Sequence, residues 1–198
     1  MIYEIIQPIE SFLSYLNITY NEIRAIEDRY ILIEKQIAWL QDEWEKEMFC
    51  TSPDYWNHEI DKLIIDSWHG SMLVLVIEIL EKWLKEVAKM HNLDLSDKKI
   101  KKLKKEKIYQ ENDGTCFVIY QEIKKEGFSS RNDTKISGLW ENINDAITAR
   151  NHIAHDPWNI IDTKKYSHEQ ITVIAKDIEK FLKILFYKGK SWNALDYL

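Results

Sequence analysis

Residues 71–84 read SMLVLVIEILEKWL, and this stretch decides the fold. Its first half is apolar on nearly every side, and charged residues appear only from Glu78 onward. A helix that is apolar all round is buried among other helices, so we expect it at the centre of a bundle. The periodic pattern around it predicts one long helix from about Tyr55 to His91.

The rest of the chain also favours long helices. It has only five Gly and three Pro among 198 residues, too few turn residues for many short strands. Apolar residues recur at three- and four-residue steps after Pro8, which we place at a helix start, and continue to about Met48. This segment predicts one helix, or two in line. Residues 51–54 read TSPD and form a break with capping residues.

Two further helices follow from the later sequence. One begins at Lys135 or Ile136, after a loop at 129–133, and ends near Ala154 because Pro157 stops it. The last long helix starts at a capping box formed by Ser167 and Gln170. The stretch 116–120 has the composition of a short strand, but the residues after it favour a helix that continues to Gly127.

These elements predict an all-α protein. We expect an up-and-down helical bundle of four to five helices over residues 53–198 and an N-terminal helical extension over residues 1–52. The bundle carries a Lys-rich excursion at 92–113. With 45% apolar residues, the chain can bury a sizeable core.

The net charge is −6, which discourages a broad electrostatic contact with nucleic acid. The charge is uneven, however, because residues 98–107 contain seven Lys and one Glu, giving that segment +6 and the rest −12. As an amphipathic basic helix this segment is a candidate for phosphate contacts, although a solvated face is the commoner role of such a run. The candidate RNA-binding side chains are Lys98, Lys99, Lys101, Lys102, Lys104 and Lys105.

Cysteine and histidine positions indicate a cytoplasmic protein that needs no metal and no cofactor. Cys50 and Cys116 lie far apart and match no metal-ligand spacing, as expected of reduced thiols. The most apolar stretch, residues 72–80, is too short and too charged to span a bilayer, so we expect no membrane association. No paired-ligand spacing connects the histidines at 58, 69, 91 and 168.

One charged residue interrupts an apolar stripe. On the helix from Ile136 the stripe reaches position 150, which is Arg150. An Arg on a core-facing stripe is costly unless it is paired or opens into a cleft, and Glu78 or Glu81 on the central helix are the candidate partners. Five residues on, His155 is about 140° round the helix, so the two converge only at a fraying helix end.

Two neighbours complete this candidate site. Asn151 shares the helical face of His155 and is placed to orient its imidazole by a hydrogen bond. His152 lies on the other side of the helix from Arg150 and is the weaker candidate.

The segment 150–155, RNHIAH, resembles the R-x4–6-H signature of the HEPN superfamily of helical nucleotide-binding and ribonuclease domains. Residues 139–147 resemble the helix that delivers this motif, and residues 79–84 resemble an earlier helix of the family. The resemblance covers roughly residues 68–186, and residues 1–57 have no counterpart in it.

The resemblance implies a homodimer in which two motif helices face one another and cleave RNA without metal. His155 would be the general base or acid for attack by a ribose 2′-OH, and Arg150 would clamp the phosphate. Asn151 would support both side chains, and Glu81 would orient Arg150. Products would be 2′,3′-cyclic phosphate and 5′-OH ends. A toxin or antiviral-defence effector, with an antitoxin or defence partner, is the implied role.

Three less specific interpretations stay open at this point. In the first, Arg150 is a structural residue sealed by carboxylates with no cleft beside it, and His155 caps the helix. In the second, the chain is a non-catalytic module that binds a nucleotide or a partner and dimerises. In the third, it is a purely structural dimerisation bundle.

Overall fold

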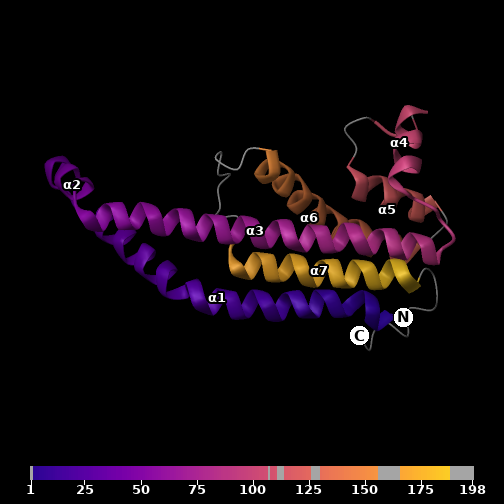
Figure 1. Cartoon of the computed structure of the whole chain (residues 1–198), viewed down its shortest axis with the longest axis horizontal. Coiled ribbons are helices and arrows are strands. Elements are labelled where there is room, and N and C mark those ends of the chain that lie inside the picture. The colour runs from indigo at the N-terminus through magenta and orange to yellow at the C-terminus, as the bar shows by residue number, and fades with distance from the viewer. Residues whose placement is uncertain (1, 107, 111–113, 126–129, 156–165, 188–198) are drawn as a thin grey trace.

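The computed structural model describes residues 2–106, 108–110, 114–125, 130–155 and 166–187, and these residues contain helices and no strand (Figure 1). The all-α class expected from the sequence is therefore confirmed. The helices in this part of the chain are α1 (Ile2–Trp39), α2 (Glu43–Cys50), α3 (Pro53–Met90), α4 (Asp97–Lys105), α5 (Thr115–Lys125), α6 (Ser130–His155) and α7 (His168–Tyr187).

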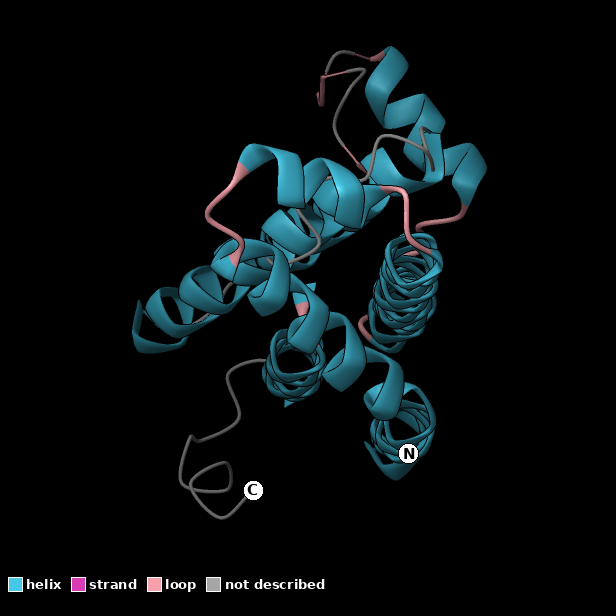
Figure 2. Ribbon diagram, turned by 90° about the vertical axis from the view of Figure 1, so that its left-hand side faces the viewer, coloured by secondary structure: helices cyan, strands magenta, loops and turns pink. Residues whose placement is uncertain are grey.

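Helices α1, α3 and α7 pack pairwise around one core, and Figure 2 shows these three nearly end on as a triangle. Helix α6 packs against α3 and α7, and α5 packs against α3. The central position expected for residues 71–84 is confirmed, because Leu73, Val76 and Leu80 are fully buried. The first half of α1 belongs to the same core through Ile9 and Leu16.

Local capping fixes several helix ends. The Ser52 hydroxyl accepts a hydrogen bond from the Tyr55 amide at 3.2 Å, which starts α3 at the border expected between residues 52 and 53. The predicted capping box of α7 is confirmed, since the Ser167 amide donates to Gln170 Oε1 at 2.9 Å and the Gln170 amide donates back to Ser167 Oγ at 3.5 Å.

Two predicted helix starts are wrong. Helix α1 begins at Ile2, so Pro8 lies inside it and not at its start. Its missing amide removes only the bond to the carbonyl of residue 4, close to the helix end, where the loss is small. Helix α6 begins at Ser130, five residues before Lys135, so residues 130–133 are helical and not a loop.

Two alternatives are also settled. Residues 116–120 are helical, as part of α5, and bury Cys116, Ile119, Tyr120 and Ile123 at three- and four-residue steps. The N-terminal segment forms two helices, because Asp42 has an extended backbone and its carboxylate accepts from the Trp44 amide at 2.9 Å to cap α2.

Residues 72–80 alone are too short to span a membrane, but the apolar part of α3 is longer than this stretch. Within α3, 18 consecutive residues reach a mean hydropathy of 1.7 and pass the test for a span by length and composition. Half of that window is buried inside the protein. The core helix of a bundle passes the same test, which fits the central position of α3.

Candidate functional site

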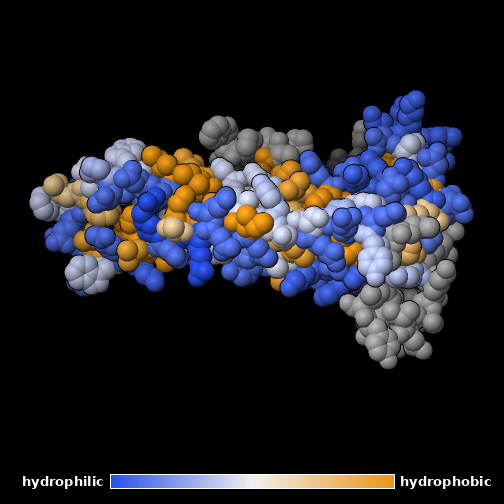
Figure 3. Space-filling model, turned by 60° about the horizontal axis from the view of Figure 1, so that its bottom comes forward, coloured by the Kyte–Doolittle hydropathy of each residue, from blue (hydrophilic) through white to orange (hydrophobic). Residues whose placement is uncertain are grey.

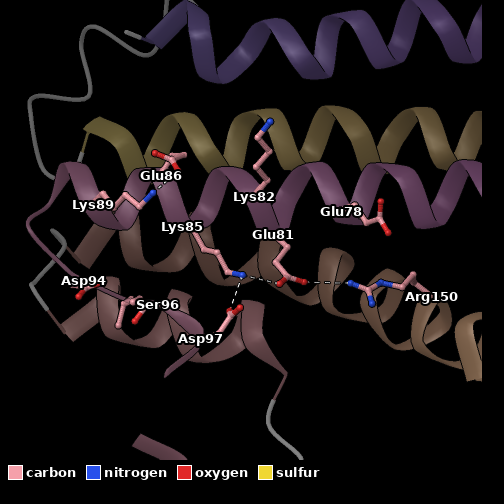
Figure 4. Close-up of a pocket in the computed structure, with 11 residues that line it drawn as sticks. Glu78, Glu81, Lys82, Lys85, Glu86, Lys89, Asp94, Ser96, Asp97 and Arg150 are labelled. Atoms are coloured by element: carbon pink, nitrogen blue, oxygen red, sulfur yellow. Dashed lines mark hydrogen bonds and ion pairs between the residues drawn. The ribbon is translucent and has the colours of Figure 1, made fainter. Parts of the chain in front are cut away.

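Arg150 lies on α6 directly after a buried turn. Ile143, Ala146 and Ile147 on the same helix are buried, so the apolar stripe leads to Arg150 as the sequence indicated. The Arg150 guanidinium turns toward α3, where its Nη2 atom is 3.5 Å from Glu81 Oε2 (Figure 4). Glu81 is thus the ion-pair partner of Arg150 within the described structure.

The ion pair extends into a chain of alternating charges. Lys85 Nζ donates to Glu81 Oε1 at 3.1 Å and to Asp97 Oδ1 at 3.0 Å, so the chain runs from α6 across α3 to the start of α4 (Figure 4). Burial opposes the charge on Lys85, but its hydrogen bonds to Asp97 and Glu81 outweigh burial and raise its pKa. The same contact lowers the pKa of Asp97. The network therefore holds Lys85 and Asp97 in their charged forms near neutral pH.

A cleft of about 650 Å³ lies beside this network. Its walls carry five carboxylates and four basic side chains, which gives the lining a net charge of −1. The structural interpretation of Arg150 is therefore wrong in expecting no cleft, while its expected pairing with a carboxylate of α3 is confirmed. The lining residues are Glu78, Glu81, Lys82, Lys85, Glu86, Lys89, Asp94, Leu95, Ser96, Asp97 and Arg150.

Arg150 keeps hydrogen-bonding capacity after pairing with Glu81. Its Nε atom is buried and has no hydrogen-bond partner in the described structure, a state that costs about 1–3 kcal/mol. The side chain is 22% exposed and lines the cleft. The buried Nε does not face solvent, so an acceptor in the cleft would meet the exposed part of the guanidinium, whose five N–H donors exceed what the contact with Glu81 engages.

The other motif residues lie in the last turn of α6. Helix α6 is described as far as His155, Pro157 lies outside the described residues, and Asn151 is exposed. The side chains of His152 and His155 lie outside the described structure, so the convergence of His155 with Arg150 stays a prediction.

The last turn of α6 rests against the middle of α3. A Cβ atom added to Gly70 would lie 3.6 Å from Ile153 Cγ2, which is ordinary contact distance. Helix α3 runs through this position without interruption. Gly70 therefore marks a helix crossing and not a break in the helix, and the crossing sets the end of α6 beside the central helix.

The predicted basic helix is α4. Ile100 and Leu103 are buried, and its lysines are mostly exposed, so the helix presents a basic outer face. Lys102 forms an ion pair with Glu106 at 3.6 Å. Ser96 and Asp97 at its start line the cleft, whereas none of the α4 lysines is among the lining residues. The exposed members are Lys98, Lys99, Lys101, Lys102 and Lys105, and Lys104 is half-buried.

The thiol of Cys116, which the sequence predicts to be reduced, is buried near the network. Burial, helped by the nearby charge of Glu81, raises the pKa of Cys116 to about 12 against the opposing effects of Arg150 and Lys85. A thiol with so high a pKa is not a nucleophile at neutral pH. Cys116 is therefore a packing residue of α5.

A second group of buried polar side chains lies between α1, α3 and α7. His69 is buried, and its Nε2 atom has no hydrogen-bond partner in the described structure. Burial lowers the pKa of His69, and the carboxylates of Glu27, Asp66 and Glu169 oppose that shift only in part. Next to it, Tyr20 stacks on His168 with 3.9 Å between ring centroids.

Two tryptophans, Trp140 and Trp158, flank the motif in the sequence. Trp140, which precedes the motif, is buried and stacks on Tyr120 at 4.6 Å, so it packs in the core and does not face a ligand. Trp158 lies outside the described residues. Among the residues searched, no group of three His, Cys, Asp or Glu side chains could hold a metal ion.

No protein-family model, curated protein or solved structure matches this chain.

Proposed function

We propose that the chain is a metal-independent endoribonuclease of the HEPN type, acting in the cytoplasm as a homodimer. The observation that carries the proposal is Arg150: a guanidinium held by Glu81 at 3.5 Å, incompletely hydrogen-bonded, on the wall of a cleft and five residues before His155. The cation would bind a phosphate and stabilise the charge that develops on its oxygens.

His155 would supply the proton transfer. An imidazole exchanges protons near neutral pH, so it can accept the proton of a ribose 2′-OH or deliver one to the leaving 5′ oxygen. Attack of the 2′ oxygen on the adjacent phosphorus then breaks the bond to the 5′ oxygen and leaves a 2′,3′-cyclic phosphate and a 5′-OH. One motif provides a single Arg and a single His, so the motif of a second copy would complete the set. Asn151 would orient His155.

The test is an RNA digestion in the presence of EDTA. Purified protein is incubated with mixed RNA, and the product ends are analysed for 2′,3′-cyclic phosphate. Arg150→Ala and His155→Ala proteins should lose at least about a hundredfold in rate while retaining their helical circular dichroism. Arg24→Ala, at an exposed position on α1, is the matched control and should cleave normally. Cleavage by both motif variants at the wild-type rate would refute the proposal.

A second candidate function is a non-catalytic module that binds a nucleotide or a partner chain and dimerises. It is favoured by the composition of the cleft, where five carboxylates face four basic side chains and Arg150 is already paired. Such a lining weakens attraction for any polyanion, so within this candidate it favours a partner chain over a nucleotide. Saturable nucleotide binding with no cyclic-phosphate ends in the same digestion would select this function. A defence or toxin role, with its own partner protein, is compatible with either candidate.

A further inference from the structure

At one end of the protein, parts of α1 and α3 project beyond the bundle and are joined by α2. We name residues 18–68 the arm: the second half of α1, the whole of α2 and the first part of α3. Helix α7 begins at the base of the arm, where His168 stacks on Tyr20 and bonds to Asn17. Beyond this level α1 and α3 extend past α7, with α2 at the tip (Figure 1).

The contact between the two arm helices is unusually polar. Arg29 forms an ion pair with Asp61, and its Nε atom donates to that carboxylate at 2.6 Å. His58 lies 2.9 Å from Glu34 Oε1 and stacks on Tyr30 with 4.3 Å between ring centroids. Asp61 and His58 are only 2% and 1% exposed. Polar and charged side chains therefore occupy the buried seam of the arm.

Large apolar side chains, by contrast, point outward. On α3, Trp56, Ile60 and Leu63 are 63%, 54% and 49% exposed. Their spacing of four and three residues puts them on one face, roughly opposite to His58 and Asp61. We name Trp56, Ile60, Leu63 and the adjacent Ile64 the α3 stripe. Figure 3 shows apolar side chains gathered over this half of the molecule.

The stripe belongs to a wider exposed apolar surface. The arm carries ten of the sixteen exposed large apolar side chains in the described structure, although it makes up about a quarter of the chain. A concentration of exposed apolar side chains in one part of a protein indicates an interaction site. The other members on the arm are Ile18, Ile31, Leu32, Trp39, Trp44 and Met48.

The charge around the stripe selects the kind of partner. The arm contains twelve Asp and Glu residues and five Lys and Arg residues, a net charge of −7. Two arms of this charge repel, which disfavours a second copy paired arm to arm, and an anionic lipid surface would repel the arm as well. Helix α4 of a second copy has the opposite charge, but its Ile100 and Leu103 are buried in their own fold and cannot cover the stripe.

We propose that the arm binds an amphipathic helix of another protein, with apolar side chains facing the α3 stripe and Lys or Arg along its flanks. Apolar ridges spaced four and three residues apart fit the grooves of such a helix. The basic flanks would meet the acidic arm. The proposal does not depend on the ribonuclease activity, because the stripe and the Arg150 cleft are separate surfaces.

The test uses the full chain and two synthetic helical peptides. One peptide has Leu on one face and Lys on the other, and the second has Glu in place of each Lys. Fluorescence anisotropy of labelled peptide should show binding of the Lys peptide only. The Ile60→Lys/Leu63→Lys protein should bind about a hundredfold more weakly, since each buried aliphatic side chain contributes about tenfold.

The matched control variant also gains two lysines, but outside the arm. Tyr15→Lys/Val173→Lys replaces two exposed apolar residues outside the arm and should change the affinity less than about threefold. Equal weakening by the two variants, equal binding of the Glu peptide, or no binding of the Lys peptide would overturn the proposal. Two further results would overturn it: a dimer of the wild-type protein, or its flotation with phosphatidylcholine vesicles, if either is lost in the Ile60→Lys/Leu63→Lys protein and kept in the control variant. Those results would assign the stripe to a second copy or to a lipid surface.

Discussion

Replacing Glu81 by Gln is expected to destabilise the protein, whereas the same change at Glu78 is expected to leave it nearly unchanged. Both side chains come from α3 and line the same cleft. Only Glu81 has ion-pair partners in the described structure, with Arg150 at 3.5 Å and Lys85 at 3.1 Å. Gln keeps the shape of Glu and removes its charge, so the comparison isolates the ion pairs.

The size of the effect follows from the distance and the exposure. At 3.5 Å and an effective dielectric constant of about 20, the attraction between Arg150 and Glu81 is roughly 5 kcal/mol. The two side chains remain 22% and 30% exposed, so solvent screening and reduced hydration cancel most of this attraction. We expect Glu81→Gln to lower the free energy of unfolding by about 1–2 kcal/mol, equivalent to a decrease in Tm of about 2–8 °C. Glu78→Gln should change the free energy by less than about 0.5 kcal/mol.

Urea unfolding followed by far-ultraviolet circular dichroism measures these free energies, with unchanged m-values as the check on two-state behaviour. A double-mutant cycle with Arg150→Met, which keeps the apolar stem, then isolates the pairwise term. Equal stability of the two Gln variants, or a coupling energy of zero between positions 81 and 150, would refute the structural role of the ion pair.

Three further predictions concern other parts of the molecule. Cys116, whose pKa burial raises to about 12, should resist a thiol reagent in the native protein at neutral pH and react as fast as Cys50 in urea. Burial lowers the pKa of His69 in the folded protein below its unfolded value of about 6.5, so the unfolded state binds more protons in acid. The contribution of neutral His69 to the free energy of unfolding should therefore be fully present above pH 6.5 and should be lost as the pH falls from there toward the folded pKa. Chemical unfolding at a series of pH values should show this slope, and His69→Gln should reduce it; an unchanged slope would contradict the assignment. Four exposed lysines of α4 are to be neutralised, namely Lys98, Lys99, Lys101 and Lys102. The slope of log RNA affinity against log salt concentration should then become shallower by about 0.7 for each RNA phosphate that the helix no longer neutralises. An unaltered slope would show that α4 is only a solvated face.

The helices could be predicted from the sequence because their signals are local. Ser52 and the pair Ser167 and Gln170 sit where capping chemistry requires them, and the structure shows those caps. The error at Pro8 came from giving a helix-start signal more weight than periodicity: Ile6 is buried and lies three residues before Ile9, so the periodic pattern already extends past the proline. Residues 130–134 include no large apolar side chain, which leaves no periodicity to detect.

The site could be predicted only in part. An Arg on an apolar stripe requires a partner, and the central helix offered two carboxylates, so the ion pair could be anticipated. The cleft depends on how the chain leaves α3. Asn92 has a left-handed backbone with φ of 61°, and the Leu93 amide donates to the Ala88 carbonyl at 2.9 Å. This turn sets α4, and with it Asp97, against Lys85. Asn after a helix is a recognisable signal for such a turn, but the direction it gives to the following helix is a tertiary property.

The distribution of charge separates binding from chemistry in the proposed ribonuclease. The cleft lining is itself slightly acidic, and the arm at the far end carries −7, so the attraction for RNA has to come mainly from the exposed lysines of α4, the helix whose first residue, Asp97, lines the cleft. Removing those lysines should therefore weaken RNA binding and its salt dependence while bound RNA is still cleaved at the normal rate. Removing the Arg150 guanidinium should do the reverse, because one partly buried cation contributes little to the long-range field but acts directly on the phosphate. If both changes alter affinity and rate together, the acidic cleft and the basic helix do not have these distinct roles.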